Sequence, residues 1–538
     1  MTTDQQWTDR LLDDRRLFEA EDYVVDGVPI ELPQKRTGPT QVQRHWQRRV
    51  IDDILPDSPN ADAPEKIPFR ILKSLTTARR TTHSLEDVVS DEFQPIRPIF
   101  WRTTKGKTGT PVAFHVLAVR GTSMNVESRA FTERTFLLLM RDERGHVNED
   151  LVSRFIERFR QAPDDLDLAQ QYVIENVEPD WDRDNEFTVE VQDFLEPVPP
   201  FAQDAANLFQ RDVKTLLDAQ LPSADHFQHV NVLLALHLGL YLPRMAFRLN
   251  PAIKALERCV ADMDAATASD VKELEQGKHP RSNFRARFKL RAPALGSQRR
   301  LPLNSPVRVT YEEMTRELAE LHFSLLLFHR LRELTKSFIR EKQNIDDEES
   351  LFELTRYPSQ IIERMKWYEE FREFLHRSLE ALVLRFFDEQ LEDRSPADAQ
   401  ELLHQHDNPL AALRDCYEAY NFQPTTTGSK TRAYRQGPQV SERLLKHSEY
   451  GIIQSRRGVG SYFELGVGLI PLLLLLVVGS DREKLQVDDF WEGLADYGLQ
   501  FGSDDRELFL TRLKSMGLYE RFSDAGEANY IRNLLIGR

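Results

Sequence analysis

The run LGVGLIPLLLLLVVGS, from Leu465 to Ser480, contains no charged residue in 16 positions and has five consecutive leucines. A membrane-spanning helix needs about 20 apolar residues. Pro471 and three glycines interrupt the run, so the continuous apolar helix shortens to about Leu472–Val478. Proline in the first turn of a helix and glycine just past its last residue, here Gly479, are typical boundary signals. The run therefore predicts a short, buried core helix rather than a membrane anchor.

The composition agrees with a soluble globular protein and a cytoplasmic location. The 538 residues are 40% hydrophobic and 29% charged, and this length predicts two to four domains. Cys259 and Cys416 are the two cysteines, so at most one disulfide bond can form, as expected for a reducing compartment. The first residues, MTTDQQWTDRLLDD, include no apolar segment, so we expect no signal peptide.

Hydrophobic periodicity predicts a mainly α-helical chain with a mixed α+β N-terminal domain. We expect a mixed domain at 1–200, a long-helix domain at 201–423 with a basic insertion at 278–308, a basic linker at 424–460 and a last domain at 461–538. In the first domain the patterns predict strands at 23–32, 111–119, 134–140 and 186–195, and a helix at 148–160. In the second they predict helices at 204–219, 226–249, 311–343 and 359–392. The last of these helices would bury Trp367.

The segment 461–538 has the pattern of a winged-helix domain. Helices are expected at 471–478, 487–499 and 503–516, followed by a hairpin at 518–535. Ser503 would cap the third helix and Gly517 would end it. In this interpretation 503–516 is the recognition helix and 518–535 is the wing.

The strongest functional signal is the basic segment 278–308, which has nine Lys or Arg residues and no acid although the chain has a net charge of −16. In an extended FRARFKLR, cations and apolar residues would alternate. Clustered cations bind phosphates through counterion release, and interleaved Phe side chains could stack on bases. The alternatives are a solvated loop, or an arm that pairs with an acidic partner or with acidic surface of this chain. The predicted nucleic-acid-binding residues here are Lys278, Arg281, Arg285, Arg287, Lys289, Arg291, Arg299 and Arg300.

A second basic stretch, 424–458, has seven Lys or Arg residues against two Glu. It either joins the same surface or is a flexible linker. Its candidate residues are Lys430, Arg432, Arg435, Arg456 and Arg457.

The predicted winged helix is acidic, since residues 481–538 contain eight Lys or Arg and twelve Asp or Glu. This favours docking of a protein partner over direct reading of DNA. The cations proposed for either role are Arg506, Arg512, Lys514 and Arg532.

We find no coherent catalytic, metal or cofactor motif. GKT at 106–108 lacks the first glycine of a phosphate-binding loop. The histidine groups at 226–237 and 404–406 lack metal-ligand spacing. A nuclease set of Asp26, Glu31 and Lys35 has too wide a gap, and Pro33 interrupts its strand. The sequence predicts a protein that is not an enzyme and carries no metal or cofactor.

Two blocks resemble a known family. They are NLFQRDVKTLLDA with VNVLLALHLGLYLPRMAFRLNPAI, within 207–253, and the tail from SYFELGVGLIPLLLLLVVG to NYIRNLL. Both resemble the DptG (DndG) accessory subunits of phosphorothioation-dependent DNA restriction, over about a quarter of the chain. The resemblance rests on apolar patterns, brings no catalytic residues, and does not extend to the mixed N-terminal domain. It implies a helical subunit of a bacterial anti-phage system that works beside an ATPase and a helicase-type partner.

These observations together predict a non-catalytic, DNA-associated subunit of a hetero-oligomeric defence system. The basic segment would contact the DNA backbone and the winged helix would bind partners. Two alternatives remain, namely a protein scaffold that never meets DNA and a degenerate metal-dependent nuclease.

Overall fold

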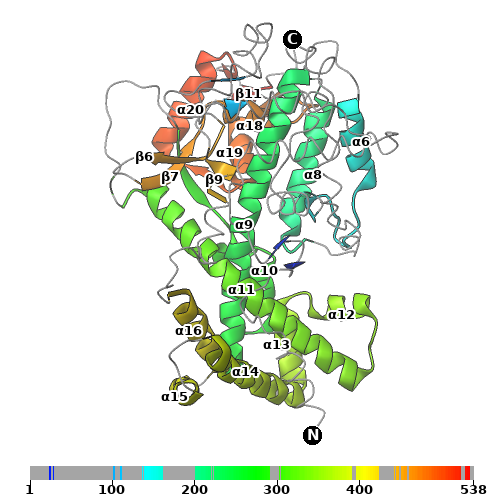
Figure 1. Ribbon diagram of the computed structural model, residues 1–538. Coiled ribbons are helices and arrows are strands. Elements are labelled where there is room, and N and C mark those ends of the chain that lie inside the picture. Colours follow the sequence, from blue (N-terminus) through cyan, green and yellow to red (C-terminus); the bar gives the residue numbers. More distant parts are fainter. Residues whose placement is uncertain are drawn as a thin grey trace, which may run out of the picture. The chain divides into compact units, whose positions relative to one another are not determined.

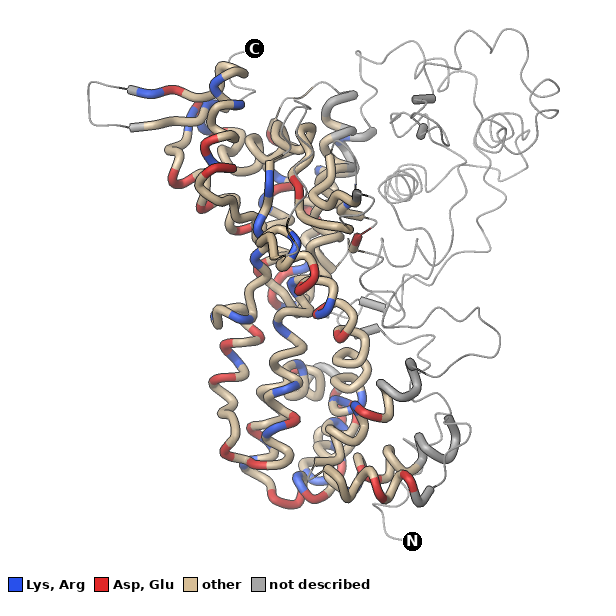
Figure 2. Tube along the Cα trace, turned by 90° about the vertical axis from the view of Figure 1, so that its left-hand side faces the viewer, with Lys and Arg blue, Asp and Glu red and all other residues tan. Residues whose placement is uncertain are grey.

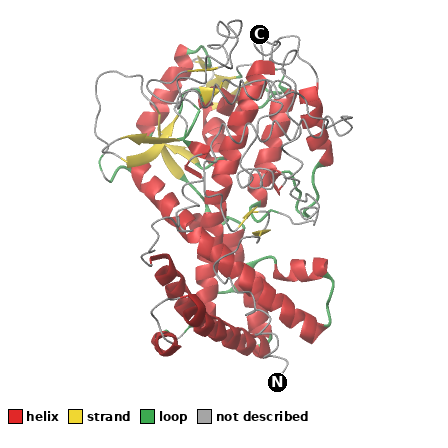
Figure 3. Cartoon of the chain, in the orientation of Figure 1, coloured by secondary structure: helices red, strands yellow, loops and turns green. Residues whose placement is uncertain are grey.

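A computed structural model describes residues 138–160, 200–219, 223–290, 304–390, 396–406, 408–422, 450–456, 460–522 and 528–533, with a few neighbouring positions and four two-residue strands nearer the N-terminus. The chain is mainly helical, with a small mixed sheet in its C-terminal part (Figure 1 and Figure 3). It divides into two compact units that are discontinuous in sequence. We call them the helical unit (described parts of Tyr241–Arg285 and Val309–Ser441) and the sheet unit (described parts of Lys35–Leu240, Ala286–Arg308 and Glu442–Arg538). The domain boundaries expected at 200, 423 and 460 stay predictions.

Two helices, α9 and α11, are much longer than the others (Figure 1). The helix predicted at 226–249 is part of α9, Ser223–Ala261, and that predicted at 311–343 is part of α11, Pro306–Gln343. By length and composition, α9 from Val232 is the one described helix that could cross a membrane, but 94% of its most apolar window is buried within the protein. A core helix passes the same test, so this is weak support for a membrane span.

The helical unit surrounds the second part of α9 with shorter helices. They are α10 (Ala268–Glu275), α12 (Glu348–Thr355), α13 (Pro358–Trp367), α14 (Glu369–Gln390), α15 (Pro396–Gln405) and α16 (Pro409–Phe422), with a 3₁₀ turn at Pro280–Ser282. α9 and α11 run alongside each other in the same direction, because Asn250 contacts Glu317 and Lys254 contacts Glu320.

The single helix predicted at 359–392 is wrong, since the chain forms α13 and α14 with a break at Tyr368. This residue has extended backbone angles, φ −128° and ψ 101°. The expected apolar stripe is present in α14, where Phe371, Leu375 and Leu379 are buried. Trp367, which the continuous pattern placed in the core, is 82% exposed because the break turns it away from the stripe.

The sheet unit combines helices α6 (Glu149–Arg160) and α8 (Gln203–Asp218) and the first part of α9 with a four-stranded sheet. The sheet order is β6-β7-β5-β9, in which β5 pairs in parallel with both neighbours and β6 pairs antiparallel with β7. Its strands are β5 (Ala286–Leu290), β6 (Ile453–Arg456), β7 (Gly460–Leu465) and β9 (Leu499–Phe501). The basic segment therefore supplies a central strand to a sheet whose other strands come from the C-terminal part of the chain.

The alternation predicted in FRARFKLR is present. Ala286, Phe288 and Leu290 are buried, and the ring of Phe288 lies 4.8 Å from that of Phe463 and 6.1 Å from that of Phe501. One face of the sheet is thus an aromatic core layer.

The C-terminal elements follow the predicted order. They are α18 (Leu469–Val478), β8 (Lys484–Gln486), α19 (Val487–Asp496), β9, α20 (Ser503–Ser515), β10 (Tyr519–Phe522) and β11 (Ala528–Arg532). β10, β11 and β8 form an antiparallel sheet in that order. Two of these elements, β8 and β9, were not predicted, because each has only three residues.

The leucine run is buried as predicted, with every side chain from Leu472 to Val478 in the core. α18 packs closely on α19, since a Cβ on Gly493 would lie 2.5 Å from Val477. At the other end of the module, Gly517 has φ +72° and ends α20 as predicted. The N–H groups of Gly517 and Leu518 donate to the carbonyls of Lys514 and Leu513, which satisfies the helix end. Ser503 is not the cap, since it is already helical and Gly502 precedes it.

Two expectations for the N-terminal domain can be compared with the structure. The helix predicted at 148–160 is α6. The strand predicted at 134–140 is wrong, because Phe136, Leu138 and Leu139 are helical and the Met140 N–H donates to the Phe136 carbonyl. A run of apolar residues without alternation does not distinguish a buried strand from a buried helix.

The remaining N-terminal expectations lie almost entirely outside the described residues. The strand predicted at 23–32 is wrong as a single strand, because β1 (Val24–Val25) pairs antiparallel with β2 (Val28–Pro29). β3 (Trp101–Arg102), which was not predicted, pairs antiparallel with β4 (Thr110–Pro111), whose last residue is the first of the strand predicted at 111–119.

We expect Leu473→Asp to unfold the C-terminal module, because it places a charge at a fully buried position. The free energy of unfolding should fall by about 4 kcal/mol or more. Limited proteolysis and far-UV circular dichroism of the purified chain measure this. Met516→Asp is the matched control, since Met516 is 44% exposed and should tolerate the same change. A Leu473→Asp protein as protease-resistant as the control contradicts the placement of α18 in the core.

Candidate nucleic-acid interface

The predicted phosphate-binding cations of 278–291 divide between the two units. Lys278, Arg281 and Arg285 are exposed in the helical unit. Arg287 is exposed and Lys289 is half-buried on β5 of the sheet unit. Within each unit the side chains reach the surface, as phosphate contact requires.

The sheet has a polar face opposite its aromatic layer. Paired residues of parallel strands point to the same side, so Arg287 lies beside Gln500 and Lys289 lies beside Glu464. Glu464 is buried and places a carboxylate next to the cations. Among the side chains that the structure describes, this face presents Arg287 and Lys289, with the buried Glu464 beside Lys289.

Base stacking on the phenylalanines of this segment is not compatible with their positions. Phe284 is 5% exposed and Phe288 is 1% exposed, because the alternation that exposes the cations turns the rings into the core. These rings are therefore not available for stacking on bases.

Several predicted residues lie outside the described residues, namely Arg291, Arg299, Arg300, Lys430, Arg432, Arg435 and Arg457. Arg456 is the last residue of β6, so the end of the expected linker belongs to the sheet, although nothing is described of its side chain. The phosphate-loop candidate at 106–108 and the nuclease set of Asp26, Glu31 and Lys35 also lie outside the described part.

The four cations of the C-terminal module do not gather on one surface of α20. The Arg506 guanidinium lies 5.1 Å from the centre of the Trp491 ring. Arg532 pairs with Glu520 across the hairpin. Arg512 is half-buried and Lys514 is exposed. Arg506 and Arg532 thus contact neighbours within the module.

The N-terminal turn of α20 contacts the four-stranded sheet through Asp505. The Asp505 carboxylate accepts a hydrogen bond of 3.1 Å from the backbone N–H of Leu290, at the end of β5. Burial raises the pKa of Asp505. A helix that reads the major groove does so with its N-terminal residues. Here Asp505 contacts the sheet, and Asp504 is a further, exposed acid.

Charge in the helical unit is dispersed. Lys and Arg alternate with Asp and Glu along its helices (Figure 2). The residues of this unit that the structure describes therefore form no extended basic stripe for a nucleic-acid backbone.

A buried polar network joins α8, α9 and the end of α19 in the sheet unit. The Asp212 Oδ2 atom accepts hydrogen bonds from the Tyr497 hydroxyl at 2.6 Å and from His237 Nε2 at 2.8 Å. Arg211 Nε donates to Asp212 Oδ1 at 3.3 Å and also pairs with Asp496 at 3.6 Å. Burial and the negative charge of Asp212 raise the pKa of Tyr497, so its hydroxyl remains a donor.

The same side chains would suit acid–base catalysis if a substrate could reach them. Asp212 and Tyr497 are fully buried and His237 is 4% exposed, so the network is structural. Our sequence reasoning missed it. The available signal was that Asp212 lies on the apolar stripe of its helix, three residues after Phe209 and four before Leu216.

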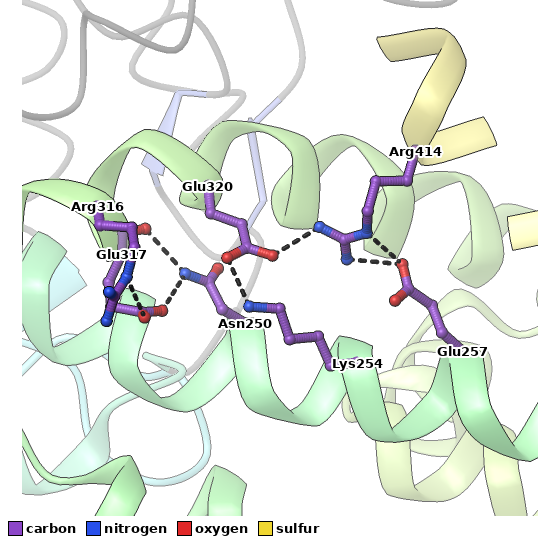
Figure 4. Close-up of polar contacts among 7 residues, drawn as sticks. All are labelled: Asn250, Lys254, Glu257, Arg316, Glu317, Glu320 and Arg414. Atoms are coloured by element: carbon purple, nitrogen blue, oxygen red, sulfur yellow. Dashed lines mark hydrogen bonds and ion pairs between the residues drawn. The ribbon is translucent and has the colours of Figure 1, made fainter. Parts of the chain in front are cut away.

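A second network holds α9, α11 and α16 together in the helical unit (Figure 4). Arg414 donates to Glu257 Oε1 at 2.6 and 3.1 Å and to Glu320 Oε1 at 2.6 Å. Its guanidinium lies 4.7 Å from the centre of the Phe323 ring. Burial raises the pKa of Glu257 despite the nearby Arg414. Two guanidinium nitrogens thus share one oxygen of Glu257 and the third donates to Glu320, so Arg414 ties α16 to both α9 and α11.

A third buried carboxylate caps a helix. Glu275 accepts hydrogen bonds of 2.7 Å from the backbone N–H and from the hydroxyl of Ser359, in the first turn of α13. Burial raises its pKa to about 7, although the bonds from Ser359 oppose the shift.

In the described part of the chain, no cluster of three His, Cys, Asp or Glu side chains could hold a metal ion. The histidines of the two groups that the structure describes are therefore not part of such a cluster. His226 is buried in α9, and burial with the nearby Arg158 lowers its pKa to about 3. His406 pairs with Asp415 at 2.8 Å.

Comparison of the chain with protein-family models and with curated proteins finds no match.

Tyr497→Phe should destabilise the sheet unit by about 2 kcal/mol, because a buried carboxylate loses one of its donors. Urea denaturation measures the change. Tyr519→Phe is the control, since it removes a hydroxyl that donates to Asn529 in a half-buried setting. It should cost less than about 1 kcal/mol. Equal effects of the two changes contradict a special role for the Asp212 network.

The Glu275 carboxyl should make stability fall as pH rises from its ordinary pKa of 4.5 to about 7. The folded state holds this proton more tightly than the unfolded state, so the stabilisation is complete below 4.5 and is lost through the window. The slope should approach about 1.4 kcal/mol per pH unit, the limit for one proton. Glu275→Gln keeps the hydrogen-bond geometry without titrating. Urea denaturation of both proteins across the window should show the stability difference changing with pH, and a constant difference contradicts the prediction.

Proposed function

We propose that this protein is a non-catalytic, DNA-associated subunit of a multi-protein bacterial defence system. Its C-terminal module would bind a protein partner and its basic segment would contact the DNA backbone. The observation that carries the proposal is the structure of that module, a helix-and-hairpin unit whose proposed reading helix has two aspartates in its first turn and is packed against the chain's own sheet.

The module from 469 to 533 is proposed to be a winged helix. The order α18, β8, α19, α20, β10 and β11, with β8 paired to the hairpin, supports this assignment. In such a fold α20 is the recognition helix and β10 with β11 is the wing. The insertion of β9 between α19 and α20 attaches the module to the four-stranded sheet.

Protein docking suits this module better than reading of DNA. Asp504 and Asp505 occupy the first turn of α20, where their negative charges would be repelled by the phosphates that flank the groove. Residues 481–538 contain more acids than bases, so the module would repel phosphates. An ATPase or helicase-type subunit is the partner that the resemblance to the DptG family implies.

Contact with DNA is proposed for the exposed cations before and within β5. The strand fixes the spacing of Arg287, which is exposed, and Lys289, which is half-buried, whereas Arg285 precedes β5. Cations on a rigid element lose less side-chain freedom when they bind than cations on a free loop. Their number suits a few phosphate contacts and no base reading.

The scaffold hypothesis is the second candidate, and Glu464 favours it. A buried acid beside Lys289 reduces the charge available to phosphate, so the cations of β5 would serve packing or an acidic protein. In that case the chain would join protein partners without binding DNA.

Reversing Arg285, Arg287 and Lys289 to Glu should weaken DNA binding to a similar degree for all sequences. The logarithm of the association constant falls linearly with the logarithm of salt concentration, and each lost phosphate contact should make this slope less negative by about 0.9. Gel-shift titrations of the full chain at low and high salt, alone and with the products of neighbouring genes, measure both effects.

The control reverses three exposed cations outside the basic segment, Lys272, Arg316 and Arg377. If the wild-type chain shows no salt-sensitive DNA binding in either setting, the DNA part of the proposal is wrong. If protein partners still co-purify with the chain after nuclease treatment, the scaffold hypothesis is supported. Deleting 278–308 is not a suitable test, because it would remove β5 from the sheet.

A further inference from the structure

Strand β5 continues past the point where its parallel neighbour β9 ends. The Ala286 N–H donates to the Gly498 carbonyl at 2.9 Å, and every second residue of a parallel strand donates to the same neighbour. This spacing places the acceptor for the Leu290 N–H at the Gly502 carbonyl. That carbonyl accepts from the Arg506 N–H at 2.9 Å, because the chain has already turned into α20. The last N–H of β5 therefore needs an acceptor from outside β9.

The side chain of Asp505 supplies this acceptor. Its Oδ1 atom accepts a hydrogen bond of 3.1 Å from the Leu290 N–H. Leu290 is fully buried, so its N–H cannot turn to solvent instead. A buried N–H without an acceptor is unfavourable, and hydrogen bonds to a charged acceptor are among the stronger ones. A side chain of α20 thus extends the hydrogen-bond ladder of β5 beyond the end of β9.

The same carboxylate lies within electrostatic reach of Lys289, the last cation of β5. Burial raises the pKa of Asp505, and the hydrogen bond from Leu290 and the positive charge of Lys289 oppose this shift. On the side of β7, Lys289 lies beside Glu464. Asp505 therefore acts both on the backbone at the end of β5 and on the charge that this end carries.

The neighbouring acid, Asp504, provides a natural comparison. It belongs to the same turn of α20 and is exposed, and it accepts a hydrogen bond of 3.2 Å from the Ser503 hydroxyl. Its charge would repel phosphates as that of Asp505 would, but its described contact is with the adjacent residue rather than with the sheet. The two aspartates thus separate the effect of charge from the effect of the hydrogen bond.

We propose that Asp505 is a positioning residue for the DNA contact, which holds the end of β5 so that Arg287 and Lys289 keep the spacing that phosphate binding requires. The inference rests on the proposed function, in which these cations touch the DNA backbone. By its charge alone, an acid beside phosphates weakens DNA binding. The hydrogen bond to Leu290 acts in the opposite direction, because it keeps the cations in place. Removal of this one acid should therefore weaken DNA binding rather than strengthen it.

The test compares Asp505→Ala, Asp505→Asn and Asp504→Ala in the full chain. Hydrogen–deuterium exchange of peptides that cover 286–290 follows the end of the strand, and gel-shift titration with a DNA duplex at several salt concentrations follows binding. In Asp505→Ala the Leu290 N–H loses its acceptor, so it should exchange about tenfold faster or more. DNA binding should weaken, with a salt slope less negative by about 0.9, the loss of one phosphate contact.

The other two variants are the controls. Asp505→Asn keeps an acceptor oxygen without the charge, so it should restore both slow exchange and DNA binding. Asp504→Ala removes an acid and leaves the strand end intact, so it should bind DNA at least as tightly as the wild type does. Circular dichroism checks that each variant is folded, and exchange in α14 should be unchanged in all three, because the effect is local.

Two results overturn the inference while the wild type still binds DNA. One is an Asp505→Ala protein that binds as tightly as Asp504→Ala. The other is an Asp505→Asn protein as weak as Asp505→Ala, since the charge rather than the hydrogen bond would then be responsible. A wild-type chain that binds no DNA overturns the proposed function, and this role of Asp505 with it. The exchange rate of Leu290 in Asp505→Ala then still shows whether the hydrogen bond holds the end of β5.

Discussion

The burial of one carboxylate, that of Asp212, constrains the whole sheet unit. A charge without solvent destabilises a protein by several kcal/mol unless donors surround it. The donors come from α9 and from the end of α19, so these elements must meet α8 at one place. Tyr497 is the residue after α19 and lies just before β9. The position of the C-terminal strands therefore follows from satisfying a group on a helix from a much earlier part of the chain.

Sequence patterns were most reliable where one local periodicity decided the outcome. The leucine run, the long helices α9 and α11 and the order of the C-terminal elements were predicted, because each buries a continuous apolar stripe or run. The helix predicted at 359–392 failed at Tyr368, where periodicity continues across a backbone break that no proline or glycine marks. The strand predicted at 134–140 failed because a short apolar run has the same composition in a buried strand and a buried helix.

The candidate site was less predictable than the fold because its character depends on neighbours distant in sequence. Alternation in FRARFKLR correctly separated the cations from the apolar residues. It could not show that β5 lies between β7 and β9, or that Glu464 stands beside Lys289. The phenylalanines were expected to be available for stacking, whereas the parallel pairing with β9 places Phe288 against Phe501. Long-range pairing converts a sequence that looks like a mobile arm into part of a core.

The central position of β5 also determines how this protein can be divided for experiments. A fragment that begins near position 461 would contain most of β7 and all of β9 but lack the strand between them. Two strand edges would then present unpaired N–H and C=O groups, and the Phe463 and Phe501 rings would lose their shared neighbour. Such edges pair readily with other chains, so the fragment would aggregate even though its helices and hairpin are locally well specified. The sheet unit is continuous in space but not in sequence, so its parts have to be expressed together. A shorter fragment would need a linker that joins β5 to the C-terminal strands.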